Sequence, residues 1–143
     1  MSPRTFARIY GIVFLLVGIA GFIPGINQPH TGDHGLRVTD PGHGMLLGLF
    51  HVNVLHNIVH LLFGVWGLIA SRDLGGSVLY ARGVAIIYAL LAIAGLIPGL
   101  NTMFGLVPIH SHDVWLHAAT AIVAAYFGWS ARAATRSDEA AAH

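Results

Sequence analysis

The chain has 143 residues, of which 55% are hydrophobic and only 9% are charged, and its mean hydropathy is +0.71. Soluble domains carry about 25% charged residues, so this composition excludes an ordinary water-soluble globule. The sequence contains no cysteine, which excludes disulfides, thiolate metal sites and cysteine nucleophiles. The net charge of +1 gives no electrostatic reason to expect nucleic acid as a partner.

Four apolar stretches without Lys, Arg, Asp or Glu follow one another along the chain, at residues 9–26, 53–70, 84–100 and 114–131. A helix of about 18 residues covers nearly 30 Å, the thickness of the hydrocarbon core of a bilayer. Helices also satisfy their own backbone hydrogen bonds in lipid. The sequence therefore predicts an all-α fold, an integral membrane four-helix bundle that forms a single domain over residues 1–143 and has the lipid bilayer as its partner.

The basic residues, which are all arginines, predict the orientation of this bundle. Six of the seven flank the apolar stretches at what would be one membrane surface, namely Arg4, Arg8, Arg72, Arg82, Arg132 and Arg136. Because cytoplasmic loops carry an excess of Lys and Arg, this distribution predicts a multi-pass protein with both termini in the cytoplasm.

An internal similarity predicts that the bundle is a duplicated hairpin. The sequence GIAGFIPGIN at 18–27 returns as AIAGLIPGLN at 92–101, and GLFHV at 48–52 resembles GLVPI at 105–109. We therefore predict two tandem helical hairpins, repeat one at about 6–72 and repeat two at about 82–132. Because both copies begin on the same side, the repeats are expected to be parallel, related by an axis along the membrane normal.

Histidines gather on the outer side, where nine of the ten lie in the expected topology. His56 and His60 stand one helical turn apart, on the same face as Asn57. On the last stretch, His117 stands one turn after Asp113. Polar residues of membrane helices normally face the bundle interior, so these side chains are expected to converge between the helices.

Such a cluster suggests a metal or haem site. Two imidazoles four residues apart on a helix can hold one metal ion, and His117 would add a third nitrogen ligand. Nitrogen ligands suit zinc, copper or iron better than magnesium or calcium. His110, His112 and Asp113 are expected to form an outer shell or an access route. Haem is the other form of this hypothesis, since His56 and His117 come from different helices, as facing axial ligands would.

The competing hypothesis is a non-catalytic structural or accessory subunit, in which buried His and Asn side chains only fix helix packing by hydrogen bonds. It would bind another membrane protein or form a homo-oligomer. The sequence shows no Ser-His-acid order, no P-loop and no GxGxxG motif, so nothing in it points to an enzyme.

Three segments carry a resemblance to a known family: VNVLHNIVHL at 52–61, IPGLNT at 97–102 and GLVPIHSHDVWLH at 105–117. They resemble a bacterial four-helix membrane family that is classified as a domain of unknown function. The resemblance covers about residues 5–132. It implies a polytopic protein of the bacterial inner (plasma) membrane, with the histidines as family features and with no established activity.

Overall fold

The computed structural model describes residues 1–29, 43–109 and 111–130 of the chain. The predicted four helices are confirmed, and two short helical turns accompany them, one between the last two helices and one after the last helix. The elements are α1 (Pro3–Ala20), α2 (Val54–Ala70), α3 (Leu74–Gly95), η1 (Met103–Gly105), α4 (His112–Ala125) and η2 (Tyr126–Ser130), a π-helical turn that continues α4.

The chain is mostly helical, as the predicted all-α class requires, but a small antiparallel sheet that was not predicted lies between α1 and α2. Its strands are β1 (Asn27–Pro29), β2 (Gly44–Leu46) and β3 (Phe50–Val52), in that order across the sheet. Met45 pairs with His51 in the β2–β3 hairpin. Strands of three residues are too short to leave a periodic pattern in the sequence, and they depend on pairing with one another.

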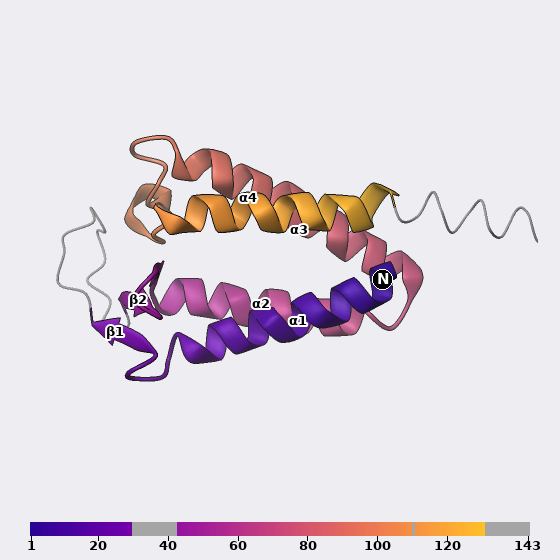
Figure 1. Cartoon of the computed structure of the whole chain (residues 1–143), viewed down its shortest axis with the longest axis horizontal. Helices are drawn as coiled ribbons and strands as arrows, with labels where there is room; N and C mark the ends of the chain where they lie inside the picture. The colour runs from indigo at the N-terminus through magenta and orange to yellow at the C-terminus, as the bar shows by residue number, and fades with distance from the viewer. Residues whose placement is uncertain (30–42, 110, 131–143) are drawn as a thin grey trace, which may run out of the picture.

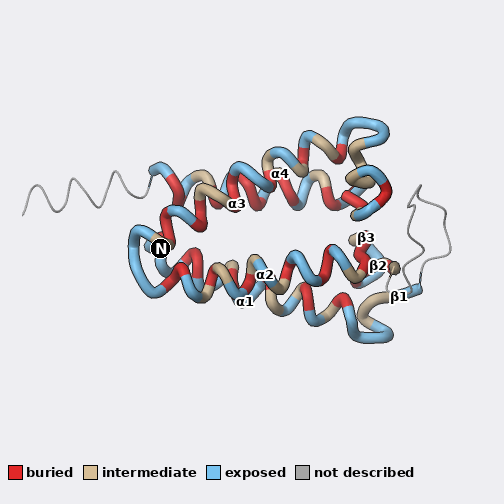
Figure 2. The backbone as a smooth tube through the Cα atoms, turned by 180° about the vertical axis from the view of Figure 1, so that it is seen from behind, coloured by how far each residue is buried: buried red, intermediate tan, exposed pale blue. Residues whose placement is uncertain are grey.

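The helices are paired as two hairpins, α1 with α2 and α3 with α4 (Figure 1). The two hairpins lie close together at the end that carries the N-terminus and diverge toward the strands. Buried residues follow the facing sides of the helices in Figure 2. The space between the hairpins at the strand end is where the histidines lie.

Local signals explain where the helices start and stop. Ser2 caps α1 by accepting a hydrogen bond from the Thr5 backbone N–H at 3.2 Å, and Pro3 occupies the first helical position. The helix therefore covers Pro3–Ala20, earlier than the expected 9–26. The chain turns away at Pro24 and at Gly25, whose φ of +92° favours glycine. Similarly, α3 starts at Leu74 and ends at Gly95 instead of covering 84–100.

Within the first hairpin, α1 and α2 approach each other through glycines. A Cβ placed on Gly67 would lie 2.8 Å from the Cα of Gly11, and a Cβ on Gly11 would lie 2.9 Å from the backbone nitrogen of Leu68. Small residues allow backbones to come this close in membrane helix pairs. The first hairpin is therefore tightly packed along its length.

An aromatic cluster joins the two hairpins at the N-terminal end. Phe6 of α1 stacks on Phe127 of η2 with ring centroids 4.9 Å apart, and it also packs against Tyr80 of α3 at 6.3 Å. Phe6 and Tyr80 are both 0% exposed. The hairpins are thus anchored to each other at this end.

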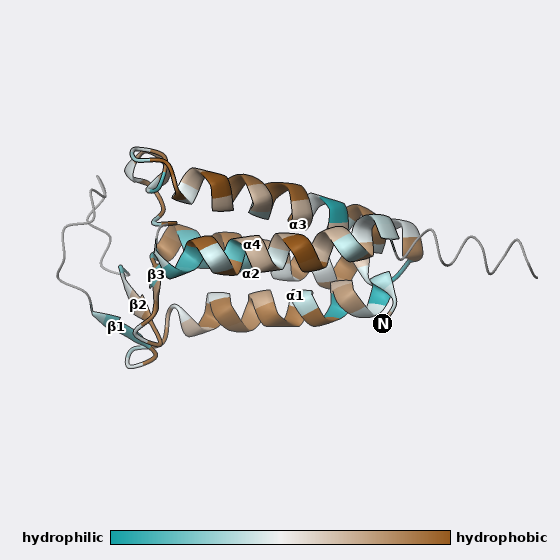
Figure 3. Cartoon of the chain, turned by 45° about the horizontal axis from the view of Figure 1, so that its top comes forward, coloured by the Kyte–Doolittle hydropathy of each residue, from teal (hydrophilic) through white to brown (hydrophobic). Residues whose placement is uncertain are grey.

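Two of the described helices, α1 and α3, are long and apolar enough to cross a membrane, and α2 is a shorter apolar helix. Figure 3 shows that the middle parts of the helices are apolar, and that teal, hydrophilic residues gather nearer the ends. Length and composition are thus compatible with membrane association.

Candidate functional site

The start of α2 positions the first histidine. Asn53 caps the helix, and its Oδ1 accepts a hydrogen bond from the His56 backbone N–H at 2.8 Å. Its Nδ2 donates to the Leu106 carbonyl at 2.7 Å, which lies in the second hairpin. One cap residue therefore starts α2 and ties it to the opposite hairpin beside the histidines.

His60 lies one turn further along α2 and has a defined proton position. Its Nδ1 lies 3.0 Å from the His56 carbonyl oxygen. A carbonyl only accepts hydrogen bonds, so Nδ1 carries the proton and, in the neutral ring, Nε2 keeps its lone pair. The His56 ring packs beside it with centroids 4.0 Å apart. The expected shared face of His56 and His60 is thus present, and both side chains are buried.

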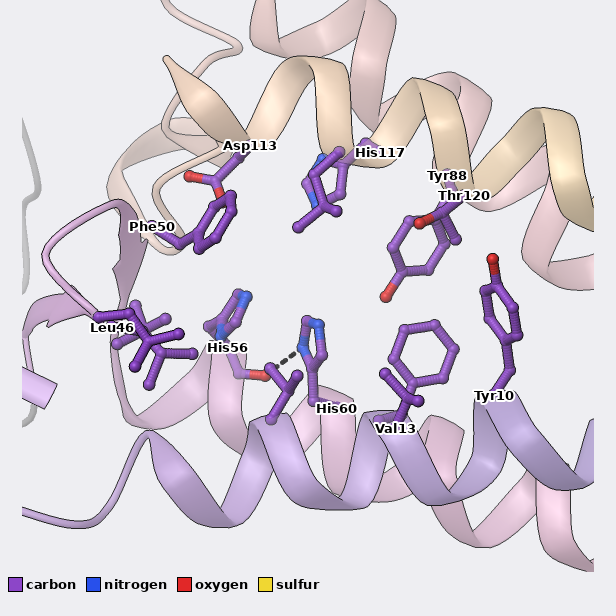
Figure 4. Close-up of a pocket in the computed structure, with 15 residues that line it drawn as sticks. Tyr10, Val13, Leu46, Phe50, His56, His60, Tyr88, Asp113, His117 and Thr120 are labelled. Atoms are coloured by element: carbon purple, nitrogen blue, oxygen red, sulfur yellow. Dashed lines mark hydrogen bonds between the residues drawn. The ribbon is translucent and has the colours of Figure 1, made fainter. Parts of the chain in front are cut away.

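His117 on α4 faces these two residues from the other hairpin (Figure 4). It is 4% exposed, and within the described parts of the chain its Nδ1 has no hydrogen-bond partner. Asp113, one turn earlier, is 3% exposed, and its Oδ2 also has no partner among the described residues. Buried polar atoms are usually paired, so these two atoms mark an incomplete polar site.

Two aromatic rings form the floor beneath the imidazoles. Phe14 of α1 meets His60 edge-on at 5.4 Å between centroids, and Tyr88 of α3 meets His117 edge-on at 5.1 Å. The sequence analysis did not single out either ring. The internal repeat could have pointed to these rings, because the alignment of the two copies that matches Asn27 with Asn101 also matches Phe14 with Tyr88.

Two cavities flank the histidines. The first, here called the α1–α4 cavity, has a volume of about 350 Å³ and is drawn in Figure 4. The second, the α2–α3 cavity, has a volume of about 300 Å³. Such volumes fall in the range of small-molecule sites. Four residues line both cavities, namely His56, His60, Tyr88 and His117.

The remaining predicted site residues are placed differently. Asp113 lines the α1–α4 cavity, as expected for a residue near the cluster. His112 is exposed, and its Nδ1 accepts a hydrogen bond from Trp115 Nε1 at 3.1 Å, so it does not join the buried histidines. His110 lies outside the described residues.

The described ranges contain no group of three or more His, Cys, Asp or Glu side chains placed to hold a metal ion. All three imidazoles line both of the cavities that flank them. Chemically, the arrangement presents imidazoles from two opposite helices to a largely apolar space, which suits a ligand larger than an ion.

A family model describes most of this chain. It matches residues 4–130, and its description is domain of unknown function DUF4383. No curated protein and no solved structure matches the chain. The matched segment includes both hairpins and every residue of the two cavities. The chain therefore belongs to this family, whose description assigns no function.

Proposed function

We propose that this protein is an integral membrane protein that binds haem between its two helical hairpins. The observation that carries the proposal is the placement of buried imidazoles from both hairpins in a space with apolar walls (Figure 4). Haem iron takes axial ligands from histidine. The macrocycle would lie between α2 and α4, with one half in each cavity.

Membrane insertion is supported by large apolar side chains exposed on the outward faces of all four helices. Such a continuous apolar surface is rare on soluble monomers and marks contact with a membrane or a partner. Its most exposed members include Leu16 (62%), Leu62 (64%), Leu90 (61%) and Ile122 (71%). With the arginine distribution, this surface favours a multi-pass bacterial plasma-membrane protein with both termini inside.

The hairpin duplication is supported by the cavities themselves. Under the alignment of the two copies, most residues that line the α1–α4 cavity have a counterpart that lines the α2–α3 cavity. Residues 13, 14 and 17 of α1 correspond to residues 87, 88 and 91 of α3. Residues 46, 47, 50 and 52 correspond to residues 103, 104, 107 and 109. Residues 116, 117 and 120 of α4 correspond to residues 55, 56 and 59 of α2. The site would therefore lie on the approximate two-fold axis of the duplicated fold.

Haem explains this geometry better than a bare metal ion does. A single ion needs convergent ligands and little space, whereas the described residues offer two cavities and no convergent group of three. A flat macrocycle with central iron needs only one imidazole on each side. Its two halves would fill two similar apolar spaces, one on either side of the axis.

Haem binding also explains the geometry better than a role of the histidines in helix packing does. The hydrogen bonds of His56 and His60 to Asn57 and to the His56 carbonyl stay within α2. A hydrogen bond that does cross between the hairpins at this end comes from Asn53, which donates to the Leu106 carbonyl. Empty space beside buried side chains lowers stability, so cavities of this size are a poor device for fixing helices.

The proposal assigns one role to each polar residue. His117 supplies the ligand from α4, and His56 or His60 supplies the ligand from α2. The bond from His60 Nδ1 to the His56 carbonyl at 3.0 Å directs Nε2 away from its own backbone. Asp113 lies one helical turn before His117, and its Oδ2 and the Nδ1 of His117 both lack a partner among the described residues. With haem bound, Asp113 would orient His117, as carboxylates commonly do behind metal-ligating histidines.

The test is the absorption spectrum of protein purified without a histidine tag and titrated with haemin in detergent. We expect a shifted Soret band that saturates at one haem per chain. The His117→Ala variant should lose the shift, whereas His112→Ala, which alters an exposed histidine outside the cavities, should retain it. Single His56→Ala and His60→Ala variants then identify the α2 ligand.

Two other outcomes would reject haem. If zinc or copper is bound in a stoichiometric amount that falls with His117→Ala, and no Soret shift occurs, the ligand is a metal ion. If neither is bound and the histidine substitutions only lower thermal stability, the histidines serve packing.

Orientation has its own test, which uses the absence of native cysteines. A cysteine at Leu49 should react in intact cells with a membrane-impermeant thiol reagent, and a cysteine at Arg72 should react only after lysis. Labelling of the Arg72 variant in intact cells would overturn the proposed topology.

A further inference from the structure

The outer end of the histidine site is covered by packed chain. The turn that contains β3 places Val52 over the α1–α4 cavity, and the corresponding turn before α4 places Ile109 over the α2–α3 cavity. These side chains are 0% and 2% exposed. The hydrogen bond from Asn53 to the Leu106 carbonyl links these two turns. Water on this side therefore meets a layer of buried apolar residues above the imidazoles.

The flanks of the two cavities differ from this covered end. Val13 and Leu116, which line the α1–α4 cavity, are 46% and 37% exposed. Leu55 and Ile87, which line the α2–α3 cavity, are 41% and 39% exposed. These side chains belong both to the cavity walls and to the outward apolar surface of the helices. The cavities thus adjoin the surface that would contact lipid.

We infer that each cavity opens sideways to the bilayer, so that the site is loaded with a flat, membrane-dissolved lipophile through the gaps between α1 and α4 and between α2 and α3. This inference rests on the proposed function, because it concerns the ligand of the same site. It adds the class of ligand and its route. Ions and polar solutes from the outer water are excluded by the apolar cover and walls.

Each cavity is also lined by a large apolar side chain on an unusual backbone, which comes from a turn at the strand end of the bundle. Leu47 beside the α1–α4 cavity has φ +55°, and Phe104 beside the α2–α3 cavity has φ +60°. They are 65% and 69% exposed and occupy matching positions in the two copies. Left-handed backbone is uncommon for such residues and often marks a functional position. Both cavities therefore have a partly exposed apolar side chain in their lining, which suits an apolar ligand.

The test measures access to the cavity without any haem. Single cysteines at Leu116, in the wall of the α1–α4 cavity, and at Ile122, on the lipid-facing side of α4, carry spin labels in liposomes. Relaxation is compared in the presence of oxygen, which concentrates in lipid, and of a water-soluble nickel chelate. We expect the label at Leu116 to respond to oxygen and not to nickel, as the label at Ile122 does. Adding Val13→Trp should remove the oxygen response at Leu116, and Ile12→Trp, a matched change outside the cavity, should leave it.

A label at Ile87 repeats the measurement on the α2–α3 cavity, so that failure of one variant to fold does not end the test. Preferential response to the nickel chelate at these positions would overturn the inference, even if the protein binds haem. The proposed function can also fail alone. If the labels show access from lipid but haemin gives no Soret shift, haem binding is rejected, and the sideways openings would serve a different lipophile.

Discussion

Phe14 of α1 and Tyr88 of α3 contact each other with ring centroids 5.5 Å apart, directly beneath the buried histidines. Each ring also supports one imidazole, Phe14 that of His60 and Tyr88 that of His117. The two rings therefore link the hairpins at the level of the site. Toward the strands the hairpins diverge.

The floor of the site should be a major source of stability. Phe14 is 5% exposed, and removing a buried phenylalanine ring costs about 3–5 kcal/mol. We expect Phe14→Ala to lower the free energy of unfolding by about this amount, measured by denaturant titration in micelles. Ile12→Ala, on the exposed face of the same helix, should change it by less than about 0.5 kcal/mol. Equal effects of the two substitutions would show that the floor does not hold the hairpins together.

In the protein without ligand, substitutions of His117 and of Asn57 should have different effects on stability. His117→Phe keeps a ring against Tyr88 and removes a buried nitrogen that lacks a partner among the described residues, a defect that costs about 1–3 kcal/mol. Stability should therefore stay the same or rise.

By contrast, Asn57→Ala removes a fully buried side chain that packs against the end of α1 beside Gly21, and this loss of packing should lower the free energy of unfolding by about 1–3 kcal/mol. Thermal unfolding of both variants tests this contrast. A larger loss for His117→Phe than for Asn57→Ala would favour the packing role of the histidines.

Because α1 and α2 lie close together, substitution by alanine should lower stability more at a glycine between these helices than at an exposed glycine. Gly67→Ala would place a Cβ 2.8 Å from the Cα of Gly11, where backbone must move, so we expect a loss of about 1–3 kcal/mol. Gly75→Ala lies in the exposed first turn of α3, where the nearest atom would be Asp73 Oδ1 at 3.4 Å. It should be neutral, or stabilise by up to about 1 kcal/mol. Equal effects in denaturant titrations would mean that the two helices are not in close contact.

Asp113 should act on haem binding through His117. Removing a carboxylate behind a metal-ligating histidine typically weakens binding about 10–100-fold. We expect Asp113→Leu to lower haem affinity by a factor in this range in a Soret titration. Asp73→Asn, which alters the exposed cap of α3, should leave haem affinity unchanged. Unchanged affinity in Asp113→Leu would remove Asp113 from the site.

At the opposite end of the bundle, Arg82 should hold the end of α4. Its guanidinium donates to the Gly128 carbonyl at 2.8 Å and lies 5.3 Å from the centre of the Trp129 ring. A hydrogen bond from a charged group contributes about 1.5–3 kcal/mol. Arg82→Ala should lower the melting temperature, and the exposed Arg8→Ala should not. A melting temperature of Arg82→Ala equal to that of the unaltered chain would contradict this role.

Features that depend on neighbours along one helix could be predicted from the sequence. The four helices exist because long apolar stretches are separated by polar and turn-forming residues. His56 and His60 share a face, and Asp113 and His117 share another, because helical periodicity brings residues four apart together. Helix ends were less predictable, since Ser2 and the turn at Pro24 moved α1 toward the N-terminus.

Features that depend on contacts between distant segments were decided by the tertiary structure alone. The outward position of His112 depends on Trp115, and the strands β1–β3 depend on pairing across a long connection. The sequence by itself determined which histidines share a helix face. Only the tertiary structure decided that these faces line two cavities instead of meeting. The physical reason is that the contacts of Phe6 with Tyr80 and Phe127, and of Phe14 with Tyr88, join the hairpins toward the N-terminal end, whereas the hairpins diverge toward the strands.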